Sequence, residues 1–65
     1  MQNYKQDIID NCEKEIGKGE IFIGFYKKIE ATQDKETAGK TALKRMQVED
    51  SVAIAKSLLE YAKSI

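Results

Sequence analysis

Hydrophobic residues recur at steps of three and four along the last third of the chain, between Val48 and Ile65. This spacing places them on one stripe of an α-helix, while charged residues occupy the opposite stripe. The pattern predicts an amphipathic helix that packs against another element. The apolar stripe consists of Val48, Val52, Ala55, Leu58, Leu59, Ala62 and Ile65, and the charged one of Asp50, Lys56, Glu60 and Lys63.

The first half of the chain predicts a second helix. Its apolar residues stay on one side when the helical count runs straight through Gly17–Gly19. A loop would have no reason to preserve that phase, so we expect one long helix from about Asn3 to Ala31. Because a mid-helix glycine costs up to about 1 kcal/mol relative to alanine, a break at Gly17–Gly19 that gives three helices is the alternative. The stripe consists of Tyr4, Ile8, Cys12, Ile16, Phe22, Ile23, Tyr26 and Ile29.

Residues 21–26 also have strand propensity. No second strand-like run exists in the sequence, so a strand here would require pairing between chains. We therefore favour helix for this segment.

The best turn in the sequence lies between the two predicted helices, from Ala31 to Lys35. Thr32 or Asp34 is suited to cap the next helix, and Glu36 supplies the negative charge that a helix N-terminus prefers. Two long antiparallel helices, about 3–31 and 35–64, joined by this turn form an all-α helical hairpin. The 65 residues make a single helical domain.

The second helix has an irregular hydrophobic phase. Ala38, Ala42, Leu43 and Met46 point to a different side from the residues after Val48. Either the helix breaks near residues 47–51, or one long helix presents two faces to two neighbours. We favour the continuous helix because of a weaker seam that runs along its whole length, through Thr37, Thr41, Val48, Val52, Ala55, Leu59 and Ala62.

The short length of the chain predicts self-association. A chain of 65 residues buries only about 60 % of its unfolded surface, so such chains usually need a disulfide, a metal or a partner subunit. Cys12 is the only cysteine, and the absence of histidine removes the commonest zinc sites. We therefore expect a homodimer or higher homo-oligomer, arranged as a helical bundle.

Four large hydrophobic residues fall outside the main stripes and are the candidate partner-binding residues: Ile21, Phe25, Leu43 and Met46. Fully burying one such side chain is worth roughly 1.5–3 kcal/mol. They form either a second interface or, in the alternative fold, the cap of a three-helix core.

The sequence carries no recognisable catalytic set, and we expect no enzyme, metal or cofactor. Gly39-Lys40-Thr41 matches the end of a phosphate-binding loop, but Asp34 stands where that motif needs its first glycine. Cys12 has no histidine to act as its base. Lys40, Lys44 and Arg45 are the candidate ligands for an anionic nucleotide in an alternative, small-ligand function.

Acidic and basic residues balance at eleven each, so the net charge does not demand nucleic acid or an anionic membrane. The first residues lack the apolar core of a signal peptide, and no run approaches membrane-spanning length. We expect a cytoplasmic protein without a membrane partner.

Two resemblances extend this picture. The stretch VEDSVAIAKSLL resembles the LEEAVMWA-type helix of phage anti-CBASS proteins, with Ala53 and Ile54 in place of the Met-Trp pair. That resemblance implies a sponge for cyclic nucleotides. The overall plan is similar to the Rop-type RNA-binding dimers, in which two hairpins form a four-helix bundle, and implies a dimer with an RNA partner. The residues that match the first family in kind are Val48, Glu49, Asp50, Val52 and Ala55.

Taken together, the patterns predict a small non-catalytic helical protein that binds and regulates or inhibits another macromolecule, most naturally a protein. Small phage or bacterial accessory proteins act in this way. The nucleotide sponge and the RNA-binding dimer are the alternatives.

Overall fold

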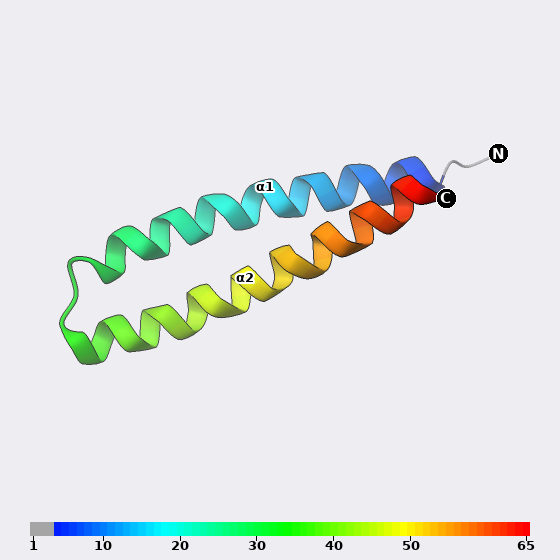
Figure 1. Ribbon diagram of the computed structural model, residues 1–65. Helices are drawn as coiled ribbons and strands as arrows, with labels where there is room; N and C mark the ends of the chain where they lie inside the picture. Colours follow the sequence, from blue (N-terminus) through cyan, green and yellow to red (C-terminus); the bar gives the residue numbers. More distant parts are fainter. Residues whose placement is uncertain (1–3) are drawn as a thin grey trace.

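The computed structural model describes residues 4–65, which form two long antiparallel helices (Figure 1). Helix α1 is Tyr4–Glu30 and helix α2 is Lys35–Ser64. The predicted hairpin is confirmed, and both helices continue through the segments where the sequence allowed a break, Gly17–Gly19 and residues 47–51. The segment with strand propensity is part of α1. The predicted start near Asn3 lies outside the described residues.

Asp34 sets the beginning of α2. Its backbone is extended, at φ −67° and ψ 166°, and its Oδ1 accepts a hydrogen bond of 3.0 Å from the backbone N–H of Thr37. This bond favours the carboxylate and holds the pKa of Asp34 below its usual value. Thr32, the other predicted cap, instead closes α1: its hydroxyl donates to the carbonyl of Ile29 at 2.9 Å.

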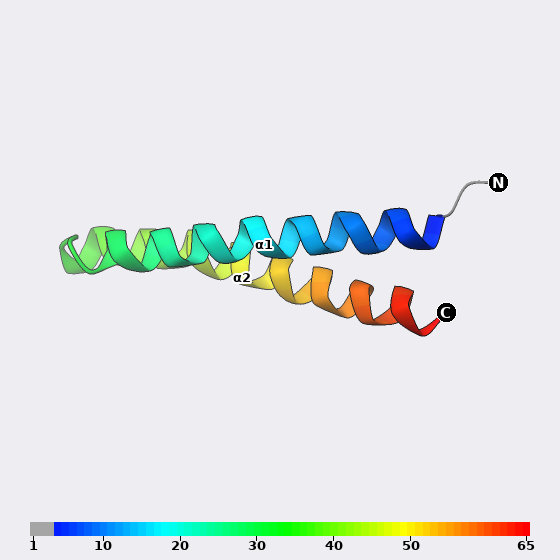
Figure 2. The same ribbon diagram turned by 90° about the horizontal axis from the view of Figure 1, so that it is seen from above.

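The residues that face the other helix follow a strict seven-residue repeat. Their steps alternate between three and four, a mean of about 3.5 residues per turn, which is the period of a left-handed coiled coil. Figure 2 shows α2 inclined to α1. All of these positions are buried or half-buried. We call them the seam: Ile9, Cys12, Ile16, Gly19, Ile23, Tyr26 and Glu30 on α1, and Ala38, Thr41, Arg45, Val48, Val52, Ala55, Leu59 and Ala62 on α2.

The seam corrects part of the predicted stripes. Tyr4 and Phe22 were placed on the buried side of α1, but their side chains are 68 % and 52 % exposed. On α2, Leu58 and Ile65 are exposed in the same way. The prediction counted about 3.6 residues per turn, whereas the helices keep contact by following 3.5, and the two counts drift apart by about 20° in every seven residues.

The helices approach each other closely at Gly19. A Cβ atom at this position would overlap Cγ2 of Val52 and would lie 3.7 Å from Cγ1 of Val48. Gly19 is buried, whereas Gly17 and Gly24 have nothing within 4 Å of the place where a Cβ would lie. Gly19 is therefore required by packing, and the other two glycines in α1 are not.

The seam is polar near the turn and apolar farther from it. Thr41 donates its hydroxyl to Oε1 of Gln33 at 2.6 Å. One turn on, Arg45 donates Nε to Oε2 of Glu30 and Nη1 to Oε1 of Glu49, both at 2.7 Å. These bonds raise the pKa of Arg45, mainly through Glu30. The bond between Arg45 and Glu30 joins specific residues of the two helices and so fixes their register.

The hairpin buries little apolar surface of its own. It measures 53 × 14 × 13 Å and exposes 5210 Å², compared with about 4,200 Å² for a compact monomer of 7.4 kDa. Among the described residues, the buried hydrophobic ones are Cys12, Val52 and Ala62. About 1,000 Å² of surface is therefore exposed beyond what a compact fold of this size leaves in water.

Candidate interaction face

Two helices side by side form a layer with two broad faces, and most of the exposed hydrophobic residues belong to one of them. From residues 4 to 65, eleven large hydrophobic side chains are exposed. Eight of these occupy the helical positions that flank the seam on a single side, together with the half-buried Ile29. We call this side the apolar face: Tyr4, Ile8, Phe22, Phe25 and Ile29 on α1, and Ile54, Leu58, Tyr61 and Ile65 on α2.

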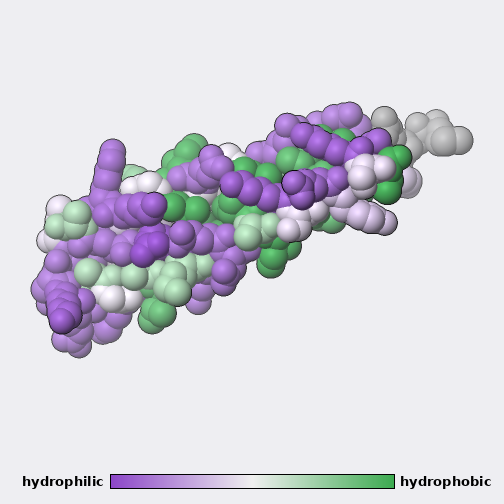
Figure 3. All heavy atoms as spheres, in the orientation of Figure 1, coloured by the Kyte–Doolittle hydropathy of each residue, from purple (hydrophilic) through white to green (hydrophobic). Residues whose placement is uncertain are grey.

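The opposite side, which we call the charged face, bears Asp10, Glu13, Glu20 and Lys27 on α1 and Glu49, Lys56, Glu60 and Lys63 on α2. Ion pairs cross between the helices there: Nζ of Lys56 lies 3.6 Å from Oε1 of Glu20, and Arg45 joins Glu30 to Glu49. The view in Figure 3 shows that hydrophilic residues cover most of one side, with hydrophobic ones between the helices and at the edges.

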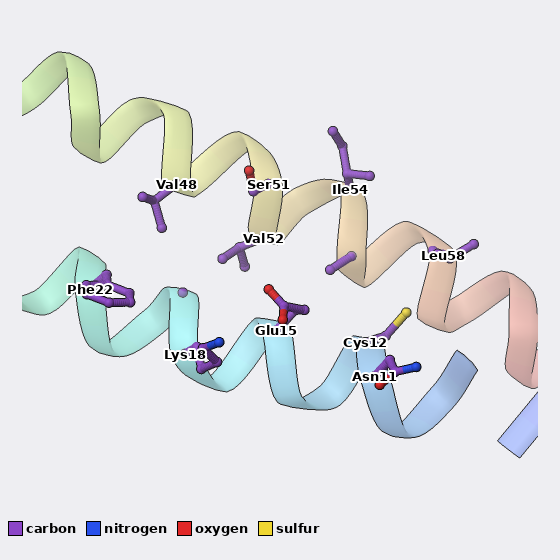
Figure 4. A pocket seen from close by; sticks show the side chains of 12 residues that line it. Asn11, Cys12, Glu15, Lys18, Phe22, Val48, Ser51, Val52, Ile54 and Leu58 are labelled. Carbon is purple, nitrogen blue, oxygen red and sulfur yellow. The ribbon is translucent and has the colours of Figure 1, made fainter. Parts of the chain in front are cut away.

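A hollow of about 520 Å³ lies at the middle of the apolar face (Figure 4). The seam residues Cys12, Gly19, Val52 and Ala55 contribute to its lining, and because they are small they leave room above them. Residues of both helices surround that space, and Figure 4 shows them projecting from the two ribbons: Asn11, Glu15, Lys18 and Phe22 from α1, and Ser51, Ile54 and Leu58 from α2.

A smaller hollow of about 220 Å³ continues the same face toward the turn. Phe25, Lys28 and Ile29 line it from the end of α1, and Thr32 lines it from the turn. Between the two hollows, the ring of Phe22 stacks on that of Tyr26, with centroids 6.5 Å apart. The apolar face is thus a broad groove with aromatic walls, of the kind that accepts side chains from a partner helix.

The four predicted partner-binding residues are all exposed, but the fold does not bring them together. Phe25 belongs to the apolar face. Ile21 and Leu43 occupy helical positions opposite the seam, at the two outer edges of the hairpin, and Met46 lies on the charged side. Sequence reasoning missed Ile54 and Tyr61, and it assigned Phe22 and Leu58 to the buried stripe. The signal in the sequence that distinguishes seam residues from residues of the apolar face is the strict alternation of three- and four-residue steps.

The three cations proposed for anion binding are also divided. Arg45 is engaged by two carboxylates, with its side chain 22 % exposed. Lys40 and Lys44 are exposed one turn apart on α2, and neither has an ion pair within residues 4–65. The arrangement leaves two adjacent lysines rather than a cluster of three available charges.

Other kinds of site find no support in the part of the chain that the structure describes. It contains no group of three or more cysteine and carboxylate side chains placed to hold a metal ion. Neither α1 nor α2 has an apolar stretch long enough to cross a bilayer. Comparison with protein-family models, curated proteins and solved structures finds no match to this chain.

Proposed function

We propose that this protein is a non-catalytic binding protein of the cytoplasm, which regulates or inhibits another protein by docking an amphipathic helix of that protein on the apolar face. The observation that carries the proposal is the segregation of exposed side chains: eight large hydrophobic ones share one face with a hollow of about 520 Å³. Small phage and bacterial accessory proteins act by contacts of this kind.

The size of the apolar face supports this function. A fully exposed side chain of this size has about 200 Å² of accessible surface. The exposed fractions of the eight residues therefore add up to roughly 1,000 Å². Polar residues such as Glu15 and Lys18 divide this area, and large apolar areas bordered by polar residues mark surfaces that bind other proteins. One partner in a stable complex buries about 800 Å², which this face can supply alone.

The composition of the face favours a helix as the bound element. Its residues recur every three or four positions along α1 and α2, which lie side by side. Between the two helices the face is open, because the seam residues beneath it are small. A partner helix presents side chains at the matching steps and can insert them into this groove. The nucleotide and RNA alternatives have weaker support, because Arg45 is already paired and the net charge is zero.

Site-specific photo-crosslinking tests the proposal. A photoreactive phenylalanine analogue replaces Ile54 on the apolar face or, as the matched control, Ile21 on the outer edge; these isoleucines are 69 % and 71 % exposed. In the cell that produces the protein, we expect the Ile54 probe to crosslink to a second, different protein, and the Ile21 probe not to do so.

The crosslinked protein is then purified and its binding is measured directly. We expect Leu58→Ser to weaken that binding at least tenfold and Leu43→Ser to leave it unchanged. Equal crosslinking from Ile54 and Ile21, or equal effects of the two serine substitutions, would refute the assignment of the apolar face.

A further inference from the structure

We infer that the apolar face also fits a second copy of this chain, in an antiparallel arrangement with a two-fold axis perpendicular to the helices. The inference rests on the proposed function in one respect, because both assign binding to the same face. It adds the identity of one partner, the symmetry of the complex and the residues that meet across the axis.

The order of residues along α1 is self-complementary about its centre. Helix α1 spans residues 4–30, so its midpoint lies near residue 17, and on the apolar face that point falls between Glu15 and Lys18. A two-fold axis there places Glu15 of each copy opposite Lys18 of the other. The same operation sets Phe25 against Ile8 and Ile29 against Tyr4, so these apolar residues meet each other, and it sets Phe22 against the polar Asn11.

On helix α2, one pair of apolar residues fits the same symmetry. On the apolar face, Ile54 and Leu58 are neighbours one turn apart. An axis that crosses α2 between them places Ile54 of each copy against Leu58 of the other, and Tyr61 against Ser51. Both side chains border the central hollow, so the second copy inserts them into the space of about 520 Å³ that each hairpin leaves open.

The register of the hairpin makes these two crossings coincide. Gly19 contacts Val52, and Glu20 pairs with Lys56. Residue 16, near the centre of α1, lies three residues before Gly19 and four before Glu20. Because the helices are antiparallel, the positions level with it on α2 lie three residues after Val52 and four after Lys56. The centre of α1 is therefore level with residues 55–60 of α2. The midpoint between Ile54 and Leu58 lies in that range. A single two-fold axis can therefore cross both helices at these positions. The fold of one hairpin does not itself require the two positions to be level.

The areas agree with a dimer. Each hairpin exposes about 1,000 Å² more than a compact monomer of its mass, and a stable complex buries about 800 Å² on each partner. Packing two hairpins through their apolar faces gives a four-helix bundle with the charged faces outward. A target helix must then compete with the second copy for the same surface.

Charge exchange across the axis is the decisive experiment. The mass in solution and the dissociation constant are measured by analytical ultracentrifugation, and we expect twice the chain mass of 7.4 kDa for the unmodified protein. Glu15→Lys places a lysine opposite Lys18 of the other copy, and Lys18→Glu places a glutamate opposite Glu15. Each repulsion occurs twice in a dimer, so each change should raise the Kd at least about tenfold. The double exchange, Glu15→Lys with Lys18→Glu, should return the Kd to within about threefold of the original.

The matched control is Glu13→Lys, the same change of charge on the charged face, which should leave the Kd unaltered. Circular dichroism on every variant establishes that the helices are intact. A monomeric protein overturns the inference, and so does a dimer for which the double exchange gives no recovery.

Spin-label distances test the direction of packing. In a Cys12→Ala background, nitroxides are attached at Lys14→Cys or Asp7→Cys, both on the outer edge of α1. The antiparallel axis separates the two labels of a dimer by about 8 Å along the helix for position 14 and about 28 Å for position 7. Equal distances for the two positions would indicate an axis parallel to the helices and would overturn the inference.

The two proposals fail separately. A monomer whose Ile54 probe still crosslinks to a different protein overturns self-association and leaves the proposed function standing. A charge-exchange-sensitive dimer whose Ile54 probe crosslinks only to its own copy supports self-association and removes the support for a regulatory target.

Discussion

The two broad faces of the hairpin have the same backbone geometry and opposite side-chain chemistry. On the charged face, ion pairs between the helices satisfy the side chains within one chain, as Lys56 and Glu20 do. On the apolar face, large side chains such as Ile54 and Phe25 remain mostly exposed above a hollow. The polar side chains of the charged face are satisfied by water and by ion pairs within one hairpin, whereas only contact with a partner would remove the side chains of the apolar face from water.

The largest effect is expected at the seam that supports both faces. Gly19→Ala introduces a Cβ that overlaps Val52, so the helices must move apart, and overpacking of this severity should cost about 3 kcal/mol. Gly17→Ala is the matched control: its site is open, and alanine should stabilise the helix by up to about 1 kcal/mol. Thermal unfolding followed by circular dichroism should show opposite shifts in Tm. A rise in Tm for both variants would mean that the helices do not meet at Gly19.

A smaller effect should distinguish the faces directly. Ile54 and Ile21 are exposed to nearly the same extent in the hairpin, 69 % and 71 %, so serine should cost the same at both positions if the hairpin acts alone. If a second hairpin covers the apolar face, Ile54→Ser should cost about 1–2 kcal/mol more per chain than Ile21→Ser. The comparison is made by urea denaturation at equal protein concentration. Equal losses would contradict a covered apolar face.

The cap of α2 should make stability depend on pH. Because the pKa of Asp34 is lower in the folded chain than its usual value of 3.8, its contribution is fully present above that value and is lost as the pH falls through the folded pKa. Asp34→Asn keeps a capping oxygen but does not titrate. The stability difference between wild type and Asp34→Asn should therefore shrink as the pH is lowered below about 4. A difference that is independent of pH between 2 and 6 would show that the Asp34 carboxylate is not the group responsible.

The smallest effect is expected from the exposed ion pair on the charged face. Both Glu20 and Lys56 have side chains that are 59 % exposed, and pairs of this kind contribute less than about 1 kcal/mol. Glu20→Gln should lower the free energy of unfolding by less than about 0.5 kcal/mol, and 0.5 M salt should abolish the difference. A large loss that persists in salt would show that the charged face also depends on a partner.

The fold was predictable from the sequence, since the helical phase runs unbroken through Gly17 and Gly19 and Asp34 is an ordinary helix cap. The facing residues were predicted only in part: the weaker seam of the second helix already contained most of those on α2, namely Thr41, Val48, Val52, Ala55, Leu59 and Ala62. The seam includes Gly19 and Arg45, which a search for hydrophobic residues passes over, because one is selected for close approach and the other for a charged pair between helices.

The candidate face was predictable only in part for the same reason. An error of one position around each helix moved Phe22 and Leu58 from the face into the predicted core. Phe25 was placed outside the core correctly, but Ile21, Leu43 and Met46 could not be assigned to separate sides until the seam was known. Self-association remains a prediction that the charge exchange at Glu15 and Lys18 will test.

The connection at residues 31–34 also governs the order in which the chain assembles. Contacts between the helices grow outward from it: Gln33 with Thr41 is a separation of 8 residues, Glu30 with Arg45 of 15, and Gly19 with Val52 of 33. Loops of about ten residues close in about 10–100 ns, so we expect the hairpin to form from its turn toward its ends. During synthesis, the part of α2 that covers the first residues of α1 leaves the ribosome after the rest of the hairpin. The N-terminal half of α1 therefore lacks its packing partner until all of α2 has been made.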